Sequence, residues 1–293
     1  MTAKIIDGRQ LAAKMRVSLG ERVVALREDG FRQPTLSVIL IGHDPASAVY
    51  VRNKVRACEA LGIKSYIHRL PPTISESALL AVISKLNADQ DVHGILVQLP
   101  IPDHIDMAKV LETISIDKDV DGFHLYNIGG LITGNTIFSP CTPYGVVKLL
   151  QSEDIAVEGQ NVVIVGASNI VGKPMAMMLM AADATVSICH AKTRDLAQFT
   201  ILADILVVAA GVPNLILPQM VKRGAVVIDV GINRLPDGTI TGDVDFTGVS
   251  AKASAITPVP GGVGPMTVTM LLENTILAAE RAAQDEANVM LVD

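Results

Sequence analysis

Residues 161–189, NVVIVGASNIVGKPMAMMLMAADATVSIC, give the clearest indication of the fold. This stretch begins with an apolar run rich in Val and Ile, passes Gly166, becomes a helical pattern from Gly172 and ends in a second apolar run at 184–189. Strand, glycine turn, helix and strand in this order form a βαβ unit. The amino end of such a helix offers free N–H groups to a pyrophosphate. We therefore predict a dinucleotide site, although the full GxGxxG pattern is absent and glycine turns also occur in βαβ units that bind no nucleotide.

The end of the second apolar run indicates which dinucleotide binds. NAD-binding units usually carry Asp or Glu there for the ribose 2′-hydroxyl. Here the segment contains His190, Lys192 and Arg194, and the first acid is Asp195. A cationic cluster suits the 2′-phosphate of NADP, although charged loop residues are often only solvated. We predict NADP, with Lys192 or Arg194 as contacts.

Further apolar runs and helical patterns extend this arrangement in both directions. Apolar runs lie at 35–42, 92–99, 204–211 and 225–232, and helical patterns lie at 8–29, 45–61, 75–88, 172–182 and 266–283. Alternating segments of this kind predict an α/β fold with parallel strands between helices. A segment with two prolines and a glycine at 139–145 divides the chain. We predict two α/β domains with an active-site cleft between them: a catalytic domain of residues 1–139 plus 272–293, and a Rossmann-type dinucleotide-binding domain of residues 140–271.

The composition excludes several classes of protein. Hydrophobic residues make up 49% of the chain and charged residues 18%, a balance that excludes a disordered protein. The net charge of −6 and the aromatic content of 3% argue against nucleic-acid binding. Three distant cysteines without CxxC or Cys/His spacing predict neither a disulfide framework nor a metal site. Because neither a signal peptide nor an apolar run of about 20 residues is visible, we expect a cytoplasmic protein that does not contact membranes.

The first half of the chain contains a candidate for a reactive lysine. In the segment HDPASAVYVRNKVRACEALG, Asp44 is placed to cap a helix. Ser47, Tyr50 and Lys54 follow at spacings of three and four residues, which puts them on one helix face. A lysine in a partly desolvated site has a lowered pKa and can act as a base. The simpler alternative is an ordinary exposed lysine.

Three further segments carry candidate ligand contacts. Gln98 interrupts an apolar run near its carboxyl end, where α/β sheets bind ligands, so it is either a structural residue or a ligand contact. DKDVDG (117–122) imitates the start of a calcium loop, but Ile128 stands where that loop needs Glu. We therefore exclude calcium and expect one carboxylate to bind a cationic or amidine-like group. TPVPGGVGPMT (257–267) predicts either a structural turn or the wall of a site.

Together these segments resemble the bifunctional methylenetetrahydrofolate dehydrogenase/cyclohydrolase family, FolD, over nearly the whole chain. The matching segments are DPASAVYVRNKVRACEALGI, GILVQLPIP, DKDVDGFHLYNIG, PCTPYG, GASNIVGKPMAM, GAVVIDVGINR, GDVDF and TPVPGGVGPMT. The resemblance implies that NADP+ oxidises 5,10-methylenetetrahydrofolate to 5,10-methenyltetrahydrofolate, which is then hydrolysed to 10-formyltetrahydrofolate. It also implies that the catalytic domain binds folate and that a homodimer forms through the dinucleotide-binding domains.

The resemblance further implies roles for individual residues. Tyr50 would stack beside the pterin and aminobenzoyl part of folate, and Asp121 would hold the pterin amino edge. Lys54 would assist the attack of water and the proton transfers, and Gln98 would tune Lys54. The remaining substrate contacts would be Ser47, Leu99, Pro100, Gly262, Gly264 and Pro265. The cofactor contacts would be Cys141, Thr142, Gly166, Ala167, Ser168, Val171, Gly172, His190, Lys192, Thr193, Gly211 and Ile232, and no metal ion would bind.

The chain departs from a common family pattern at two positions. Ala167 and Ala191 stand where many members carry side chains that can contact the 2′-phosphate, so NADP binding would depend on His190, Lys192 and Arg194. The alternatives to a bifunctional enzyme are a monofunctional methylenetetrahydrofolate dehydrogenase and a non-catalytic folate- or nucleotide-binding protein. The lysine, glutamine and aspartate named above argue against both.

Overall fold

A computed structural model describes residues 2–290, which form two compact units. Unit 1 contains residues 2–14 and 140–267, and unit 2 contains residues 15–139 and 268–290. The chain passes between the units within two long helices, α1 (Gly8–Glu28) and α10 (Val263–Met290), and at residues 139–140. Each unit has a parallel sheet of its own, which supports the predicted α/β class.

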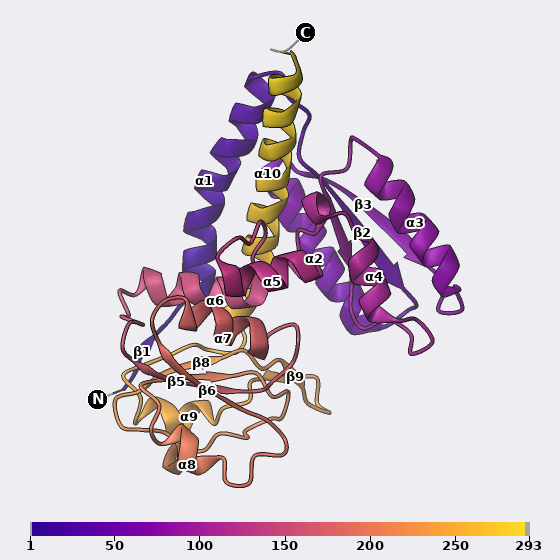
Figure 1. Ribbon diagram of the computed structural model, residues 1–293. Coiled ribbons are helices and arrows are strands. Elements are labelled where there is room, and N and C mark those ends of the chain that lie inside the picture. The colour runs from indigo at the N-terminus through magenta and orange to yellow at the C-terminus, as the bar shows by residue number, and fades with distance from the viewer. Residues whose placement is uncertain (1, 291–293) are drawn as a thin grey trace. The chain divides into compact units, whose positions relative to one another are not determined.

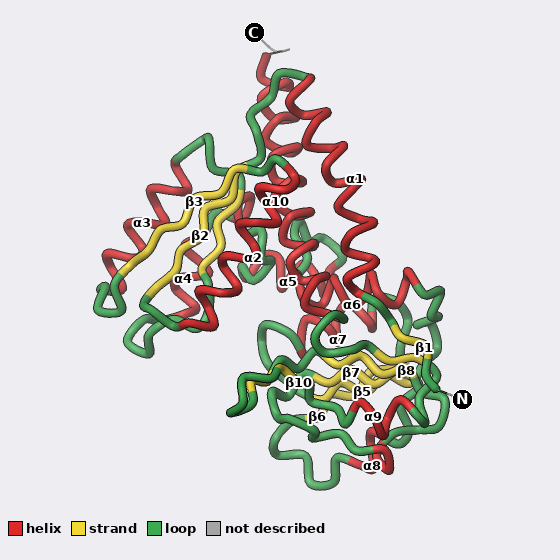
Figure 2. Tube along the Cα trace, turned by 180° about the vertical axis from the view of Figure 1, so that it is seen from behind, coloured by secondary structure: helices red, strands yellow, loops and turns green. Residues whose placement is uncertain are grey.

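Unit 1 is built on a six-stranded, fully parallel sheet (Figure 1). In sheet order its strands are β1 (Lys4–Ile5), β11 (Ala255–Ile256), β8 (Val226–Asp229), β7 (Ile205–Val208), β5 (Asn161–Val165) and β6 (Thr185–Cys189). Its other elements are α6 (Cys141–Ser152), α7 (Gly172–Met180), α8 (Ala197–Thr200), α9 (Phe246–Ser250), the 3-10 helix η2 (Pro218–Met220) and the hairpin of β9 (Asn233–Arg234) and β10 (Ile240–Thr241). Figures 1 and 2 show α6 and α7 on one face of this sheet and α8 and α9 on the other, which explains why the central strands are apolar on both faces.

The order of the strands in unit 1 reverses beside β5. The chain runs from β5 to its neighbour β6 and then crosses to β7 on the opposite side of β5. The carboxyl ends of β5 and β7 meet where Val165 pairs with Val208. In open α/β sheets a ligand binds outside the carboxyl ends of the strands at such a reversal, because the loops there diverge and leave a crevice.

The amino-terminal residues of the described chain belong to unit 1. The short strand β1 pairs in parallel with β11, with Lys4 opposite Ala255 and Ile5 opposite Ile256. A strand of two residues leaves no periodic pattern in a sequence. The predicted division of the chain therefore differs from the compact units at residues 2–14 and 268–271, and as a division into functional domains it stays a prediction.

Unit 2 contains a three-stranded parallel sheet (Figure 2). Its strands are, in sheet order, β3 (Lys64–Leu70), β2 (Thr35–Ile41) and β4 (Gly94–Val97). Its other elements, besides most of α1 and α10, are α2 (Pro45–Leu61), α3 (Glu76–Ala88), α4 (Met107–Thr113), the 3-10 helix η1 (Ile116–Lys118) and α5 (Leu125–Thr133). Helices α3 and α4 cover one face of the sheet and α2 covers the other.

The core of unit 2 fixes the carboxyl ends of β2 and β4. Leu79 and Ile83 of α3 are fully buried against Ile39 and Ile95 of the sheet, and Val110 of α4 joins the same cluster. Each such side chain contributes roughly 1.5–3 kcal/mol when it is removed from water. The loops that leave β2 and β4 therefore start from a rigid base, and these loops lead into the candidate site.

The structure confirms most of the elements expected from the pattern of apolar residues. The segment 45–61 forms α2 with the predicted bounds, and the run at 161–166 forms β5. The strand β3 was not predicted, because KSYIHRL mixes charged and apolar residues on a half-exposed strand at the edge of its sheet. Within residues 2–290, no helix is both long enough and apolar enough to cross a membrane.

Candidate functional site

Helix α2 presents Lys54 to Gln98 in unit 2. The helix begins at Pro45, and the side chain of Asp44 accepts a hydrogen bond from the backbone N–H of Ser47 at 2.7 Å. Gln98 follows β4 directly, and its backbone N–H continues the ladder to the carbonyl of Ile39 at 2.9 Å. The Nζ of Lys54 donates to Oε1 of Gln98 at 3.0 Å. Lys54 and Gln98 are both half-buried, so neither has the simple environment of a solvated surface residue.

The carbonyl of Leu99 connects Gln98 to the first turn of α2 through two hydrogen bonds. It accepts a hydrogen bond from Nε2 of Gln98 at 2.8 Å and one from Oγ of Ser47 at 3.4 Å. Because both ends of the Gln98 amide are engaged, its oxygen is fixed toward Lys54. The Leu99–Pro100 peptide is cis, and Pro100 is exposed while Ser47 is buried. Tyr50 lies one helical turn before Lys54 with 39% of its surface exposed.

The acidic turn at 117–122 contains three aspartates in different environments. Asp117 is an exposed residue that pairs with Arg281 at 3.8 Å. Asp119 is buried and accepts hydrogen bonds from the backbone of His124 at 2.7 Å and from the side chain of Asn127 at 2.8 Å. Burial, helped by the nearby carboxylate of Asp121, raises the pKa of Asp119 to about 6 despite these bonds. Asp119 therefore stabilises the turn through its hydrogen bonds. Asp121 is half-buried and stands directly before Gly122.

The glycine turn of unit 1 has no room for side chains. Gly166 follows β5 with a φ of +122°, and a Cβ there would lie 2.1 Å from the carbonyl oxygen of Ala209. A Cβ on Gly172, the first residue of α7, would lie 1.9 Å from the carbonyl oxygen of Gly166. The Oγ of Ser168 accepts from the backbone N–H of Val171 at 3.1 Å. The backbone therefore approaches itself closely at the amino end of α7, the kind of turn at which dinucleotide-binding proteins place a pyrophosphate.

The segment after β6 forms a tight turn that contains the predicted cationic cluster. The backbone N–H of His190 donates to Oγ1 of Thr193 at 2.9 Å, and Nδ1 of His190 accepts from the backbone N–H of Lys192 at 3.1 Å. His190, Lys192 and Arg194 are exposed. The turn also adjoins the glycine turn, because the N–H of Gly166 donates to the carbonyl of Cys189 at 2.9 Å. A 2′-phosphate at this edge of the sheet would find two cationic side chains.

Two buried carboxylates at the same edge of the sheet were not singled out from the sequence. Asp229 ends β8, and Asp243 follows β10. Oδ2 of Asp243 accepts from the backbone N–H groups of Ala210 at 2.6 Å and Gly211 at 2.8 Å. Burial raises the pKa of Asp229 to about 6. Asp229 and Asp243 lie in the segments GAVVIDVGINR and GDVDF, which carry the family resemblance but predicted no role for either aspartate.

The remaining predicted contacts are distributed along unit 1. Thr142 lies in the first turn of α6, where its Oγ1 is 3.1 Å from Oγ1 of Thr267. Cys141 and Gly262 are buried, Gly264 and Pro265 are half-buried, and Ile232 is exposed with Gly264 as a neighbour. Thr142 lies in α6, Gly264 and Pro265 lie in the first turn of α10, and Ile232 lies between β8 and β9. Lys54, Gln98, Tyr50 and Asp121 belong to unit 2.

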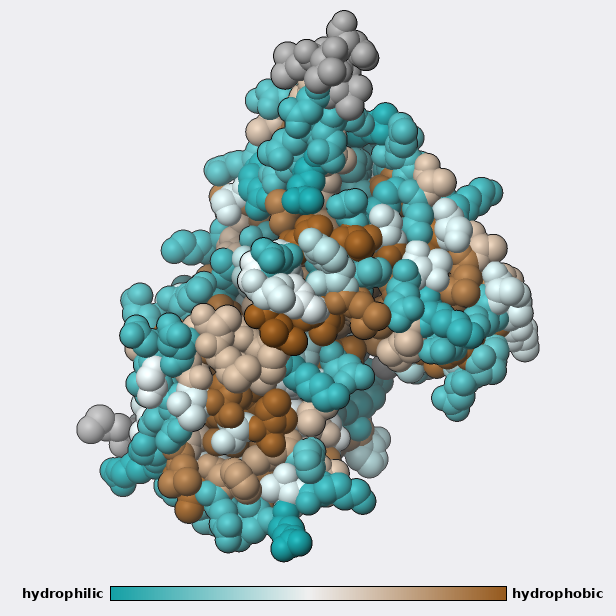
Figure 3. Space-filling model, in the orientation of Figure 1, coloured by the Kyte–Doolittle hydropathy of each residue, from teal (hydrophilic) through white to brown (hydrophobic). Residues whose placement is uncertain are grey.

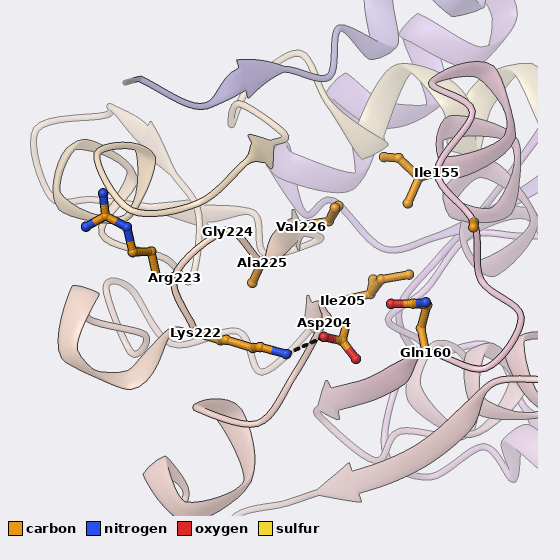
Figure 4. Close-up of a pocket in the computed structure, with 10 residues that line it drawn as sticks. Ile155, Gln160, Asp204, Ile205, Lys222, Arg223, Gly224, Ala225 and Val226 are labelled. Atoms are coloured by element: carbon orange, nitrogen blue, oxygen red, sulfur yellow. Dashed lines mark hydrogen bonds and ion pairs between the residues drawn. The ribbon is translucent and has the colours of Figure 1, made fainter.

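A separate surface pocket of about 170 Å³ lies at the opposite edge of the unit 1 sheet (Figure 4). Its lining residues stand at the amino ends of β5, β7 and β8: Ile155, Ala156, Gln160, Asp204, Ile205, Lys222, Arg223, Gly224, Ala225 and Val226. Two of its charged groups pair with each other, since Nζ of Lys222 lies 2.5 Å from Oδ1 of Asp204. No predicted site residue lines this pocket. Among residues 2–290, no group of three or more His, Cys, Asp or Glu side chains could hold a metal ion.

Comparison with protein-family models matches both parts of the chain. The model described as tetrahydrofolate dehydrogenase/cyclohydrolase, NAD(P)-binding domain, matches residues 140–283. The model described as tetrahydrofolate dehydrogenase/cyclohydrolase, catalytic domain, matches residues 6–121. The two matched segments contain the glycine turn and the Lys54–Gln98 pair, respectively.

Curated relatives and solved structures agree with this match. The chain is 57% identical over 282 residues to "Bifunctional protein FolD" of Nitrosospira multiformis, covering 96% of this chain and 98% of the relative. It is 59% identical over 287 residues to the protein of the same name from Burkholderia lata, covering 98% and 100%. The structure of the bifunctional enzyme FolD from Campylobacter jejuni is similar with a TM-score of 0.93 and 54% identity, covering 95% of this chain and 99% of that one. The FolD structure from Trypanosoma brucei, complexed with NADP cofactor and inhibitor, is similar with a TM-score of 0.93 and 38% identity, covering 97% and 99%.

Proposed function

This chain belongs to the tetrahydrofolate dehydrogenase/cyclohydrolase family, and on that premise we propose how its residues divide the two reactions of a bifunctional folate enzyme. The enzyme oxidises 5,10-methylenetetrahydrofolate to 5,10-methenyltetrahydrofolate with NADP+ and then hydrolyses the product to 10-formyltetrahydrofolate. In our proposal the Lys54–Gln98 pair of unit 2 performs the hydrolysis. The carboxyl edge of the unit 1 sheet binds NADP.

The observation that carries the proposal is the 3.0 Å hydrogen bond from Lys54 to Gln98. In the hydrolysis, water adds to the methenyl carbon of a cationic substrate, and a proton must leave that water before the ring opens. An amine can accept and return this proton if it lies beside the reacting carbon. Gln98 accepts from the Nζ of Lys54, so it fixes the direction of the amine without adding a charge of its own beside the cationic substrate.

We propose folate contacts on each of the two units. Tyr50 lies on the same face of α2 as Lys54, and its partly exposed ring offers a surface on which the pterin and aminobenzoyl groups can stack. Asp121 offers a carboxylate to the amino edge of the pterin, where two N–H groups can be bound at once. Ser47, Leu99 and Pro100 complete the contacts on unit 2. Gly262, Gly264 and Pro265 are the contacts that we propose on unit 1.

The cofactor contacts that we propose lie at the carboxyl edge of the unit 1 sheet. Gly166, Ala167, Ser168, Val171 and Gly172 would hold the pyrophosphate, and His190, Lys192 and Thr193 would hold the 2′-phosphate side with help from Arg194. Cys141, Thr142, Gly211 and Ile232 would line the remainder. NADP+ accepts a hydride from the methylene carbon, a step that depends mainly on how the two carbons are positioned. This assignment is supported by the tight packing at Gly166 and Gly172, where the backbone leaves no room for a Cβ atom.

We also propose that the enzyme is a cytoplasmic homodimer joined through unit 1. Strand β6 lies at the edge of its sheet with no partner strand on its outer side among the described residues. Figure 3 shows apolar side chains over the region of α7, β6 and α8. The exposed large hydrophobic residues there are Met180, Ile188, Phe199, Ile201 and Leu202. An apolar patch beside an unpaired strand edge is typical of a surface that is covered in an assembly.

Replacing Lys54 by methionine tests the assignment of the hydrolysis. We expect Lys54→Met to lower the rate of 5,10-methenyltetrahydrofolate hydrolysis by at least about a hundredfold, the usual contribution of an acid–base group. Binding of the folate should persist, because Tyr50 and Asp121 are unchanged. Lys85→Met is the matched control, since Lys85 is exposed on α3. Unchanged hydrolysis in the Lys54 variant would reject the assignment, and a wild-type chain that oxidises without hydrolysing would favour a monofunctional dehydrogenase.

A further inference from the structure

The buried carboxylate of Asp243 holds two segments of unit 1 that lie far apart in sequence. It is fully buried. Its Oδ2 accepts from the N–H groups of Ala210 at 2.6 Å and Gly211 at 2.8 Å, in the segment after β7. Its Oδ1 accepts from Nδ2 of Asn233 at 2.8 Å, in the hairpin after β8. All three bonds lie toward the carboxyl edge of the sheet, where the strand order reverses.

One peptide plane connects Asp243 to the glycine turn. In the trans peptide between Ala209 and Ala210, the C=O and N–H groups point in opposite directions. The N–H of Ala210 points at Asp243, and the carbonyl oxygen of Ala209 points at Gly166, where a Cβ would approach it to 2.1 Å. The carboxylate therefore helps to orient the carbonyl that packs against Gly166, together with the bond from the N–H of Ala209 to the carbonyl of Val165 at 2.7 Å.

The N–H of Ala209 still donates to the carbonyl of Val165 at 2.7 Å, and the segment beyond it leaves the sheet. Residues 211–214 are exposed, and Gly211 has a φ of +68°. A backbone that leaves a strand and enters an exposed loop loses its ladder hydrogen bonds, so its N–H groups need other acceptors. Asp243 supplies the acceptor for two consecutive groups. Without Asp243, the half-buried N–H of Ala210 could donate a hydrogen bond only to a water molecule at this edge of the sheet.

Asp243 is itself fixed by the neighbouring Asp229. Oδ1 of Asp229 accepts from the N–H groups of Gly231 at 2.9 Å and Asp243 at 3.0 Å, and Oδ2 accepts from Val244 at 3.0 Å. The two carboxylates are enclosed by glycines. A Cβ on Gly231 would lie 2.3 Å from Asp243, and a Cβ on Gly242 would lie 1.9 Å from Asp229. The carboxylate of Asp243 therefore has one well-defined position.

We infer that Asp243 is a positioning residue for the dinucleotide. It acts by holding the 209–210 peptide against the glycine turn that we propose as the pyrophosphate site. The inference rests on the proposed NADP-dependent function. It requires that loss of the carboxylate weakens nucleotide binding and leaves unchanged the nucleotide-free hydrolysis, which we assigned to Lys54 in unit 2.

The test compares Asp243→Ala, Asp243→Asn and a matched control, Asp237→Ala, in the full chain. Asp237 lies on the turn between β9 and β10. It is exposed, so Asp237→Ala removes a carboxylate from the surface, whereas Asp243→Ala removes a buried one. Binding of NADP+ is measured by titration calorimetry, and hydrolysis of 5,10-methenyltetrahydrofolate is measured without nucleotide. We expect Asp243→Ala to raise the Kd for NADP+ by about tenfold or more, because the N–H groups of Ala210 and Gly211 lose their acceptor. Asp243→Asn keeps an amide oxygen for Ala210 and Gly211, so its Kd should lie between those of the wild type and the alanine variant.

The hydrolysis rate separates positioning from a general structural role. Support requires that hydrolysis in the Asp243 variants and NADP+ binding in Asp237→Ala stay within about twofold of the wild type. A folded alanine variant with the wild-type Kd overturns the inference, and so does a parallel loss of hydrolysis and binding. If Asp243→Ala does not fold, the asparagine variant decides: weaker binding supports the inference and equal binding overturns it. A wild-type chain that binds no NADP+ would instead contradict the proposed function.

Discussion

Gly166 shows how a single residue shapes the cofactor edge of unit 1. Its φ of +122° is a conformation that side chains rarely adopt, and a Cβ would lie 2.1 Å from the carbonyl oxygen of Ala209. Backbone strain and overpacking each cost about 1–3 kcal/mol. Both effects act together here, because the atom that blocks the Cβ belongs to the backbone of a neighbouring loop and has little freedom to move.

We therefore expect Gly166→Ala to lower the free energy of unfolding by about 3 kcal/mol and to weaken NADP+ binding. Gly129→Ala in α5 is the control, since a Cβ there meets no atom within 4 Å. In a helix interior that change should stabilise the chain by about 0.5–1 kcal/mol. Urea unfolding of both variants measures the two values. An alanine at 166 without a stability loss would contradict the packing described for the turn.

Individual residues also mark the limit of what the sequence could predict. The spacing of Ser47, Tyr50 and Lys54 predicts a shared helix face, and the structure confirms the helix. The roles of Asp229 and Asp243 could not be predicted, because each depends on N–H groups in segments that come together only in the folded sheet. Local spacing contains no information about such partners.

At the scale of one element, α2 illustrates how local signals set the position of the candidate catalytic residues. Its bounds follow from Asp44 and Pro45 at the start and Gly62 at the end, where a φ of +73° ends the helix. Strands β1 and β3 lacked comparable signals, since one has two residues and the other is half-exposed with charged positions. Elements with caps and a continuous apolar side were predictable, and short or edge strands were not.

The cap at the start of α2 yields a prediction at this scale. Asp44→Ala removes the acceptor for the N–H of Ser47 and should lower the free energy of unfolding by about 1 kcal/mol. Asp44→Asn keeps an acceptor oxygen and should lie within a few tenths of the wild type. Thermal or urea unfolding distinguishes the two. If both variants lose the same stability, the charge of Asp44 rather than its capping bond supports the helix.

At the scale of the whole molecule, stability should depend on pH through His93. This histidine is buried beside β4, its Nδ1 has no hydrogen-bond partner, and burial lowers its pKa to about 4, with Lys118 and Arg32 acting in the same direction. The unfolded chain binds a proton near pH 6.5, and the folded chain does so only near pH 4. Stability from the neutral histidine is therefore complete above pH 6.5 and is lost as the pH falls toward 4.

His93→Gln isolates this effect from other titrating groups. Asp119 and Asp229, whose pKa values are raised to about 6, act with the opposite sign and are present in both chains. Between pH 7 and pH 4.5, the difference in unfolding free energy between wild type and variant should shift by about 2 kcal/mol in favour of the variant. Urea unfolding at a series of pH values measures the difference. A difference that does not change with pH would contradict the buried, neutral state of His93.

One rate measurement shows whether the whole protein works as a bifunctional folate enzyme that uses NADP. The purified chain is given 5,10-methylenetetrahydrofolate with NADP+ or NAD+ in parallel, and both cofactor reduction and the methenyl intermediate are followed. We expect NADP+ to be reduced faster than NAD+ and little methenyl product to accumulate, because it is hydrolysed. Equal or faster use of NAD+ would contradict the 2′-phosphate role of Lys192 and Arg194, and reduction of neither cofactor would contradict the function itself.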